Sequence, residues 1–220
     1  MNILESKGIT IQDLGSGILV YSNVLPRDLN IQERLEDVLG SQSGPYTWQP
    51  AYVGYQQLMP EYRDCVDFKY KKSDLYNDGT EEYNKLAAIW DDCYSRQKEA
   101  VDDYCAKFNI HNLRYWEAFN FIKYKEGQHF QYHHDHGYSY NCTVSLVAYL
   151  NDDYEGGGLH FSQQNIMYTP KAGDVVIFPS TYMYPHRAMP VENGTKYSLV
   201  TMLDYSDKYH QPEMYQETGK

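Results

Sequence analysis

Long apolar runs are missing from this chain of 220 residues, and so is a recognisable export signal. No stretch approaches the roughly 20 consecutive apolar residues that a membrane-spanning helix needs. The first seven residues, Met-Asn-Ile-Leu-Glu-Ser-Lys, lack the basic-then-apolar order of a secretory signal peptide. These absences predict a cytoplasmic protein that does not associate with membranes.

Cysteine is scarce and shows no metal-binding or redox spacing. None of the four residues, Cys65, Cys93, Cys105 and Cys142, forms a Cys-x-x-Cys pair. The pattern predicts ordinary, mostly buried thiols in a reducing compartment. Because sequence cannot give connectivity, one oxidised pair stays open.

Positive charge is also in short supply, with 19 Lys and Arg against 30 Asp and Glu and a formal net charge of −11. Proteins that bind nucleic acid through its phosphates usually carry a basic stripe. We therefore expect no nucleic-acid partner. The charge suits a neutral or cationic partner instead, although net charge mainly governs solubility.

Tyrosine, by contrast, is abundant, with 24 residues in the chain. Many of them lie between Tyr46 and Tyr83, interleaved with Trp48 and two prolines. Tyrosine combines an apolar face with a hydroxyl, a chemistry enriched at recognition surfaces. It is also a good strand former, so a structural role is the other interpretation.

Two stretches have helical periodicity. Residues 27–39 repeat apolar side chains on a roughly helical period. Thr80 then offers an N-terminal cap with acids in the first turn, followed by an apolar stripe that ends near Asn109. We expect both helices to pack against the outside of a sheet.

From Leu113 onward the pattern is one of short strands broken by turns, after earlier strands expected at 18–21 and 62–70. The expected strands are 116–124, one that contains 133–135, and then 141–150, 159–161, 166–169, 174–178, 186–189 and 196–203. About eight strands with regular turns predict a closed or double-sheet, mainly β architecture with flanking helices. No linker divides the chain. We expect a single domain over 1–205, in which 1–112 supply strands, helices and the Tyr-rich loop and 113–205 form the β core, followed by a polar tail at 206–220.

The run from Tyr124 to Asp135 contains the strongest chemical signal. In a strand, alternate residues point to the same face, so His133 and Asp135 would project together while His134 points away. An imidazole and a carboxylate are two-thirds of the facial triad that holds non-haem Fe(II), and His186 is the candidate for the second imidazole. Two alternatives remain: a shifted register that pairs His134 with His136, and a histidine cluster without a metal.

Together these residues resemble the prolyl 4-hydroxylase branch of the Fe(II)/2-oxoglutarate dioxygenases. The resemblance covers roughly residues 116–205 well and the N-terminal half only loosely. Its phrases, in order, are Tyr124-x-x-Gly127-x-x-Phe130-x-x-His133-x-Asp135, Tyr149-Leu150-Asn151, Glu155-Gly156-Gly157-Gly158-Leu159-x-Phe161, Pro170-Lys171-x-Gly173-Asp174 and Ile177-Phe178-Pro179-Ser180. One His-x-Asp pair means little, but five phrases in this order are specific.

The resemblance implies a double-stranded β-helix core, which is a jelly roll of the cupin-like kind. It implies Fe(II) as the metal, held by His133, Asp135 and His186, which are also the catalytic centre. It further implies 2-oxoglutarate and O2 as co-substrates, with ascorbate as the reductant. In this family 2-oxoglutarate is decarboxylated to succinate and CO2 while a C–H bond of the substrate is hydroxylated.

The same resemblance assigns the 2-oxoglutarate site. Lys196 would pair with the distal C5 carboxylate, which must be compensated when buried. Tyr149 would add its hydroxyl there, and Tyr124 would line the pocket. Ser198 lies on the same strand face as Lys196 and is the candidate for a second hydroxyl. Phe130 departs from the family, because a tyrosine is frequent at this position and its hydroxyl is absent here.

Three kinds of function are compatible with these residues. The branch implies hydroxylation of a prolyl residue in a peptide or protein, and the Tyr-rich segment 46–83 would then be a candidate lid over an extended chain. The same chemistry on a free amino acid, another small metabolite or a nucleobase is the alternative, and a non-catalytic jelly-roll binding module is a third. The sequence leaves the oligomeric state open.

Overall fold

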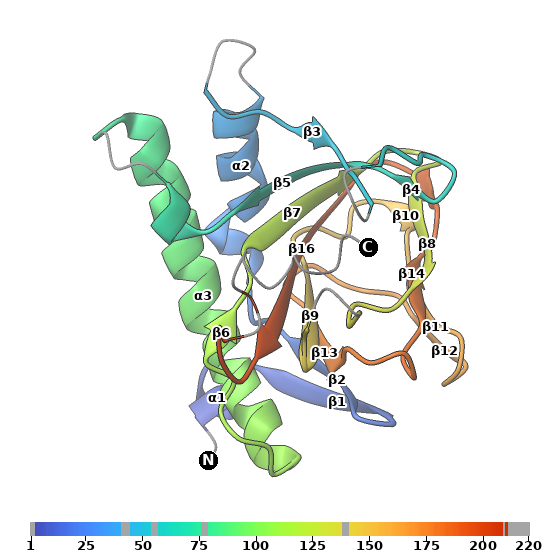
Figure 1. Cartoon of the computed structure of the whole chain (residues 1–220). Coiled ribbons are helices and arrows are strands. Elements are labelled where there is room, and N and C mark those ends of the chain that lie inside the picture. The colour runs from blue at the N-terminus through green and yellow to red at the C-terminus, as the bar shows by residue number, and fades with distance from the viewer. Residues whose placement is uncertain are drawn as a thin grey trace.

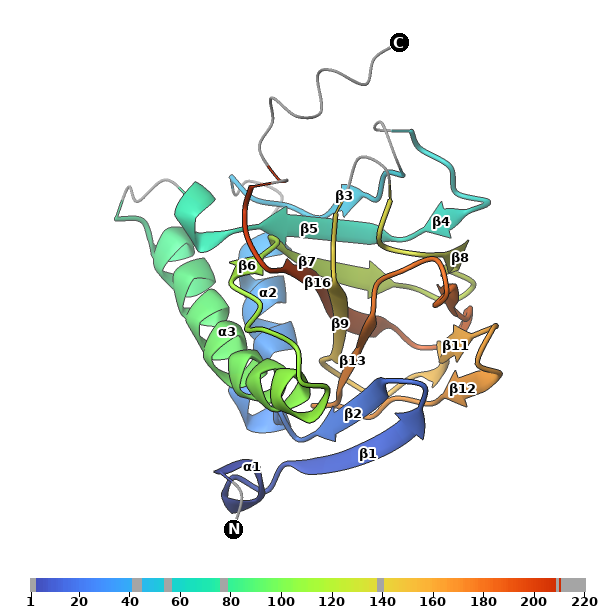
Figure 2. The same ribbon diagram turned by 60° about the horizontal axis from the view of Figure 1, so that its bottom comes forward.

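Two facing β-sheets with helices on one side make up the architecture (Figure 1). The computed structural model describes residues 3–40, 45–53, 57–75, 79–137, 141–208 and 210. Turning the molecule shows α2 and α3 against one face of the larger sheet and the smaller sheet across from its other face (Figure 2). Every strand pairing in these ranges is antiparallel.

The large sheet has nine strands. In spatial order they are β1 (Thr10–Gly15), β2 (Ile18–Ser22), β13 (Val175–Pro179), β9 (Val144–Tyr149), β16 (Lys196–Asp204), β7 (Phe119–Tyr124), β5 (Val66–Tyr70) and β3 (Gln49–Pro50), with β6 (Tyr115–Trp116) paired to β16.

The small sheet has five strands, and a separate two-stranded sheet lies beside it. The five are β12 (Ile166–Tyr168), β11 (Leu159–Phe161), β14 (His186–Ala188), β8 (His129–His133) and β4 (Arg63–Asp64), and the pair is β10 (Glu155–Gly156) with β15 (Val191–Asn193).

The helices follow local sequence signals with one break. They are α1 (Ile3–Ser6), α2 (Ile31–Leu39) and α3 (Glu81–Lys107), with 3-10 turns η1 (Arg27–Leu29) and η2 (Lys72–Asp74). The helix expected over 27–39 is wrong in its first turn, because Asn30 takes a left-handed conformation at φ 49° and separates η1 from α2. The cap of α3 is as predicted, since the Thr80 side chain accepts a hydrogen bond from the Tyr83 amide.

Two expected strands are divided in the structure. The predicted strand 62–70 becomes β4 and β5, which belong to different sheets, so the chain passes from one sheet to the other at Cys65. The predicted strand 116–124 is interrupted between β6 and β7. Both breaks depend on partners distant in sequence, which local alternation cannot show.

Along the central strands of the large sheet, alternate side chains point to opposite faces of the sheet. On β7, Phe119 and Phe121 are fully buried against the helices, in one core with Leu86 and Ile89 of α3. Their neighbours Asn120 and Tyr124 line a cavity between the sheets. This alternation is the period-two rule of a strand covered on both faces.

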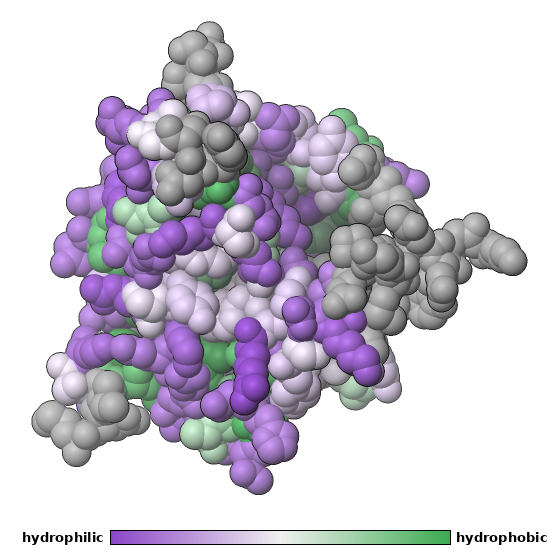
Figure 3. Space-filling view, turned by 60° about the vertical axis from the view of Figure 1, so that its left-hand side comes forward, coloured by the Kyte–Doolittle hydropathy of each residue, from purple (hydrophilic) through white to green (hydrophobic). Residues whose placement is uncertain are grey.

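The helical side presents a mainly hydrophilic surface to solvent (Figure 3). Within the described ranges no helix combines the length and apolarity that crossing a membrane requires. The long helix α3 instead buries one stripe, with Trp90 and Tyr104 on it, and exposes its charged residues.

Candidate active site

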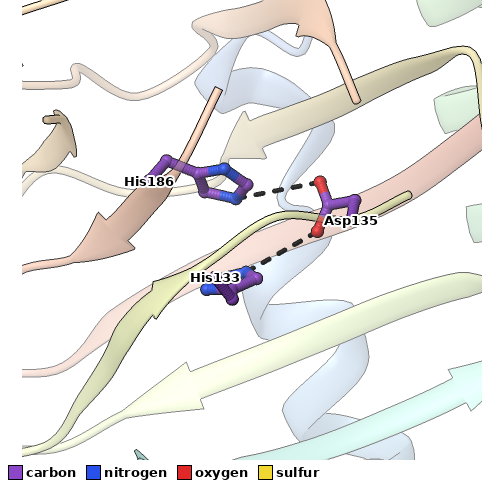
Figure 4. A group of neighbouring side chains, drawn as sticks. All are labelled: His133, Asp135 and His186. Carbon is purple, nitrogen blue, oxygen red and sulfur yellow. Dashed lines mark ion pairs between the residues drawn. The ribbon is translucent and has the colours of Figure 1, made fainter. Parts of the chain in front are cut away.

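Three side chains from separate segments meet in the cavity between the sheets. His133 ends β8, Asp135 lies two residues beyond it, and His186 begins β14 directly opposite His133 in the strand register. One ligand atom from each lies within 4.8 Å of the other two. The Asp135 carboxylate is 3.6 Å from His133 Nε2 and 3.7 Å from His186 Nε2, and the three side chains point toward one another (Figure 4).

Backbone carbonyls orient both imidazole rings. His133 Nδ1 lies 2.8 Å from the Gln131 carbonyl and His186 Nδ1 lies 3.1 Å from the Tyr184 carbonyl. Because a carbonyl only accepts, each Nδ1 carries the proton, and the lone pair of Nε2 is directed at the carboxylate. Burial, with the nearby charges of His186 and Arg63, lowers the pKa of His133, which keeps that ring neutral.

This donor set fits a divalent iron site. Two imidazole lone pairs and a carboxylate that is only 6% exposed repel one another unless a cation lies between them. Two His and one carboxylate on one face of a metal are typical of non-haem Fe(II) centres, which keep their other coordination positions open.

The shifted register is not observed. His134 is exposed and its Nδ1 lies 2.6 Å from the His136 carbonyl, whereas His136 Nδ1 lies 2.8 Å from the Cys142 carbonyl. The expectation that Asp135 shares a strand with His133 is wrong, because β8 stops at His133 and a bend carries Asp135. The bend still directs the carboxylate to the same place.

Two serines that we did not single out from the sequence hold the carboxylate. Ser145 Oγ donates to Asp135 Oδ2 at 2.5 Å and lies 2.7 Å from Ser180 Oγ, and both serines are buried. The sequence signal for Ser145 was the alternation of β9, which places it on the same face as Tyr149. Ser180 ends one of the family-like phrases, but its role was not predicted.

The three converging residues line one end of a cavity of about 100 Å³. That is several times the ~10–15 Å³ that one water molecule needs. All four side chains predicted for the co-substrate also line it, namely Lys196, Tyr149, Tyr124 and Ser198.

Lys196 is a buried cation without an acidic partner in the described residues. Its side chain donates to the Gly157 carbonyl at 2.6 Å, and its Nζ lies 5.1 Å and 5.3 Å from the ring centres of Tyr124 and Tyr149. Burial lowers the pKa of Lys196 to about 7, because the ammonium has lost its hydration. An anion beside it would restore the charged form.

The hydroxyls around Lys196 differ in how they are bonded. Tyr149 Oη is buried and has no hydrogen-bond partner within the described part of the chain. The Tyr124 hydroxyl lies at the Cys65 thiol, and burial raises the pKa of both phenols. Ser198 is buried and lies directly opposite Tyr149 in the strand register. An unsatisfied phenol beside a lysine without an acid is the arrangement a bound carboxylate would complete.

The described part of the Tyr-rich segment is anchored rather than free. Tyr70 is buried in the core, Trp48 packs on Tyr197 at 6.2 Å between ring centres, and Tyr62 packs edge-on against Phe130. These contacts favour a packing role for the three rings. The candidate lid also includes residues 54–56 and 76–78, which lie outside the described residues, as do 209 and 211–220 of the expected tail.

Comparison with known proteins identifies the region that carries this site. Residues 119–203 match the model of the 2OG-Fe(II) oxygenase superfamily. The matched region is less than half of the chain, and it contains all seven of the predicted metal and co-substrate residues.

Two relatives of known name match part of this chain. A protein of Acanthamoeba polyphaga mimivirus, whose assigned name is that of a prolyl 4-hydroxylase, is 26% identical over an alignment of 120 residues that covers 46% of this chain and 49% of that protein. Procollagen-lysine,2-oxoglutarate 5-dioxygenase 2 of Homo sapiens is 31% identical over 74 residues, which are 33% of this chain and 10% of that one. The chain thus matches about half the length of the viral relative.

Solved structures share the fold over most of the chain. A Trichoplax adhaerens prolyl hydroxylase in complex with a hypoxia inducible factor peptide fragment has a TM-score of 0.64 at 15% identity, covering 93% of this chain and 88% of that one. A Pseudomonas putida prolyl-4-hydroxylase has a TM-score of 0.59 at 21% identity, covering 92% and 100%. The predicted jelly-roll fold is confirmed by these structures, and the predicted resemblance is confirmed by the family model and the viral relative.

Proposed function

We propose that this protein is an Fe(II)- and 2-oxoglutarate-dependent hydroxylase that acts on a prolyl residue of a peptide or protein. One observation carries the proposal: a two-histidine, one-carboxylate cluster shares a cavity with a lysine that has no acidic partner in the described ranges. A divalent metal would be held by the cluster, and a carboxylate of a dicarboxylate ligand would pair with the lysine.

The residues have distinct tasks in this proposal. The Nε2 atoms of His133 and His186 and the Asp135 carboxylate hold the iron on one face, and Ser145 keeps the carboxylate oriented. When bound, the iron and 2-oxoglutarate supply the oxidising chemistry that turns O2 and a C–H bond into an alcohol, with succinate and CO2 as the other products. The family resemblance adds ascorbate as the reductant that keeps the metal ferrous.

At the other end of the cavity, Lys196 would hold the C5 carboxylate. Its ammonium supplies the positive charge and Tyr149 a hydroxyl donor that is otherwise without a partner among the described residues. Ser198 and Tyr124 border the same space, where apolar neighbours such as Val147 and Leu159 exclude water. Exclusion of water strengthens each of these charge interactions.

The prolyl substrate rests on the relatives' names and on the chain's charge of −11, which suits a neutral or cationic peptide better than nucleic acid. The test is to incubate the protein with Fe(II), ascorbate, 2-oxoglutarate and proline-rich peptides, following succinate and peptide mass. We expect succinate release together with the gain of one oxygen atom on proline.

Two other outcomes would support the other hypotheses. Succinate release without a change in any peptide would favour a small-molecule substrate over a peptide. No succinate with any addition would indicate a binding module. The variant His133→Ala is the matched control, because removal of one ligand should stop both signals while the fold persists.

A further inference from the structure

Two buried polar atoms in the cavity have no assigned task in the chemistry above. Arg63 Nε and Asn120 Oδ1 are both inaccessible to solvent and lack a hydrogen-bond partner in the described part of the chain. Both side chains line the cavity together with His133 and Asp135. Buried polar atoms are nearly always paired, so an unpaired donor and an unpaired acceptor at one cavity call for an explanation.

Asp67 holds both side chains in place. Arg63 Nη2 and Asn120 Nδ2 donate to the same oxygen, Asp67 Oδ2, at 2.8 Å and 3.3 Å, and Arg63 Nη1 donates to the Tyr52 carbonyl at 2.8 Å. Because a carboxylate only accepts, the Asn120 amide must turn its NH2 toward Asp67. Its carbonyl oxygen is thereby left over, as is the Nε–H of Arg63.

This pair lies beside the metal ligands. The Arg63 guanidinium lies 5.0 Å from the centre of the Phe130 ring, and that ring stacks on His133 with 3.7 Å between centres. Phe130 has no hydroxyl to offer, so it supplies no polar contact at this wall. The Cys65 thiol approaches the guanidinium as well, but a thiol is only a weak hydrogen-bonding group and does not satisfy it.

We propose that Arg63 and Asn120 clamp the backbone of one residue of an extended substrate peptide, with Arg63 Nε–H donating to that residue's carbonyl and Asn120 Oδ1 accepting from its N–H. The assignment rests on the proposed function and names the feature of the peptide that the site recognises. A donor next to an acceptor matches the C=O and N–H of one extended residue, which point to the same side of the chain. A carboxylate or phosphate would offer acceptors only and would meet Asn120 Oδ1 and Asp67 unfavourably.

The clamp restricts which bond can be held. A proline nitrogen has no hydrogen, so the amide in front of a proline cannot donate to Asn120. The residue held must therefore be one other than proline. In Pro-Pro-Gly repeats only glycine qualifies, and its N–H is that of the Pro–Gly amide.

The test measures binding and not turnover. A fluorescently labelled Pro-Pro-Gly peptide and a version with an ester at each Pro–Gly linkage are titrated by fluorescence anisotropy against protein loaded with Mn(II) and N-oxalylglycine. The ester removes the N–H at almost unchanged shape. For the wild type we expect the ester to bind about fivefold to tenfold more weakly, the usual range for one hydrogen bond.

The variant Asn120→Leu should bind the two peptides equally well, because it has lost the acceptor, and Asn120→Ala, which also lacks one, is a second variant should the leucine disturb folding. Asn112→Leu makes the same change at an exposed site and should keep the wild-type preference. Arg63→Lys should weaken both peptides alike.

An equal loss of ester affinity in the wild type and in Asn120→Leu would overturn the clamp and leave an ordered water as the occupant of this corner. If the wild type hydroxylates the peptide and yet binds amide and ester equally, the clamp fails while the proposed function stands. If the wild type binds no peptide at all, both fail.

Discussion

The two faces of the large sheet are built from the same strands but differ in chemistry. On the helical face, Trp90 of α3 stacks on Phe119 at 4.0 Å between ring centres, and Tyr70 stacks on Phe121 at 5.8 Å. On the cavity face, the neighbouring Asn120 lines the cavity and has a buried side-chain oxygen without a partner in the described residues. Adjacent residues of one strand thus differ sharply: one is packed among aromatic rings, and the next carries a polar atom without a partner.

The helical face stabilises the fold, whereas unpaired polar groups on the cavity face destabilise it. Apolar burial on the helical face is favourable by about 25 cal/mol per Å². A buried polar group without a partner, such as the Tyr149 hydroxyl, costs on the order of 1–3 kcal/mol. Cavity-face residues should therefore be replaceable without loss of the fold, and helical-face residues without loss of the chemistry.

The largest expected effects come from exchanging one residue of the helical face and one residue that lines the cavity from the small sheet. Phe121→Ala should lower the free energy of unfolding by about 3–5 kcal/mol, because it leaves a cavity in the core, while the folded fraction keeps its activity. His133→Ala should abolish succinate release and change stability far less. Urea denaturation and succinate assays on both variants check the comparison, and a catalytic loss per folded molecule in Phe121→Ala would break it.

Lys196→Met should weaken 2-oxoglutarate binding by about tenfold to a hundredfold, since a hydrogen bond to a charged group contributes about 1.5–3 kcal/mol. The ligand-free variant should be as stable as the wild type or more stable, because a desolvated ammonium has been removed. Calorimetric titration measures the affinity. Lys98→Met, an exposed lysine of α3, is the control, and an unchanged affinity in Lys196→Met would refute its assigned role.

Ser145→Ala should reduce Mn(II) affinity by about tenfold, because partners that orient a metal ligand commonly contribute 10- to 100-fold. The Asp135 carboxylate would lose its short contact and rotate more freely. Ser145→Thr keeps the hydroxyl and should restore most of the affinity. Equal Mn(II) dissociation constants for the wild type and Ser145→Ala would show that the bend alone positions Asp135.

The smallest effect is a pair of opposite pH trends. Folding lowers the pKa of Lys196 to about 7, so above that pH the native amine is neutral while the unfolded lysine keeps its proton up to about pH 10. The unfolded state then binds more protons, and this residue's contribution to stability rises with pH. Affinity for 2-oxoglutarate should fall over the same range, by at most about tenfold per pH unit, because the amine must first be protonated.

The difference between the wild type and Lys196→Met isolates both trends from the titration of other groups. Thermal unfolding and 2-oxoglutarate titrations from pH 7 to pH 9 would measure them. Parallel pH profiles for the two proteins would mean that Lys196 stays charged in the free protein.

Local patterns were sufficient for much of the fold. The Thr80 cap and the apolar stripe of α3 depend on residues within a few positions of one another, so periodicity alone predicted them. The alternation along β16 likewise placed Ser198 on the same face as Lys196, whereas the family resemblance placed Tyr149 beside it, and all three line the cavity. The break at Asn30 was missed, because a left-handed residue between two helical turns has no strong sequence signal.

The site was only partly predictable for a related reason. His133, Asp135, His186 and Lys196 could be singled out because their chemistry is distinctive and their motifs are close to a known family's. Ser145, Arg63 and Asn120 are ordinary residues whose importance comes from what lies opposite them. Sequence spacing does not report such neighbours, since Arg63 and Asn120 meet only through Asp67.

The order of residues along the chain by itself determined the alternating strands and the capped helix, because each depends on contacts within a strand or a helical turn. It also singled out candidate metal and carboxylate ligands, because their motifs resemble those of a known family. Only the tertiary structure decided that Cys65 marks the crossing between sheets, that a bend and not a strand carries Asp135, and that a donor and an acceptor remain unpaired beside the metal ligands. Those features arise where segments distant in sequence pack together, and packing between distant segments is settled by the whole fold.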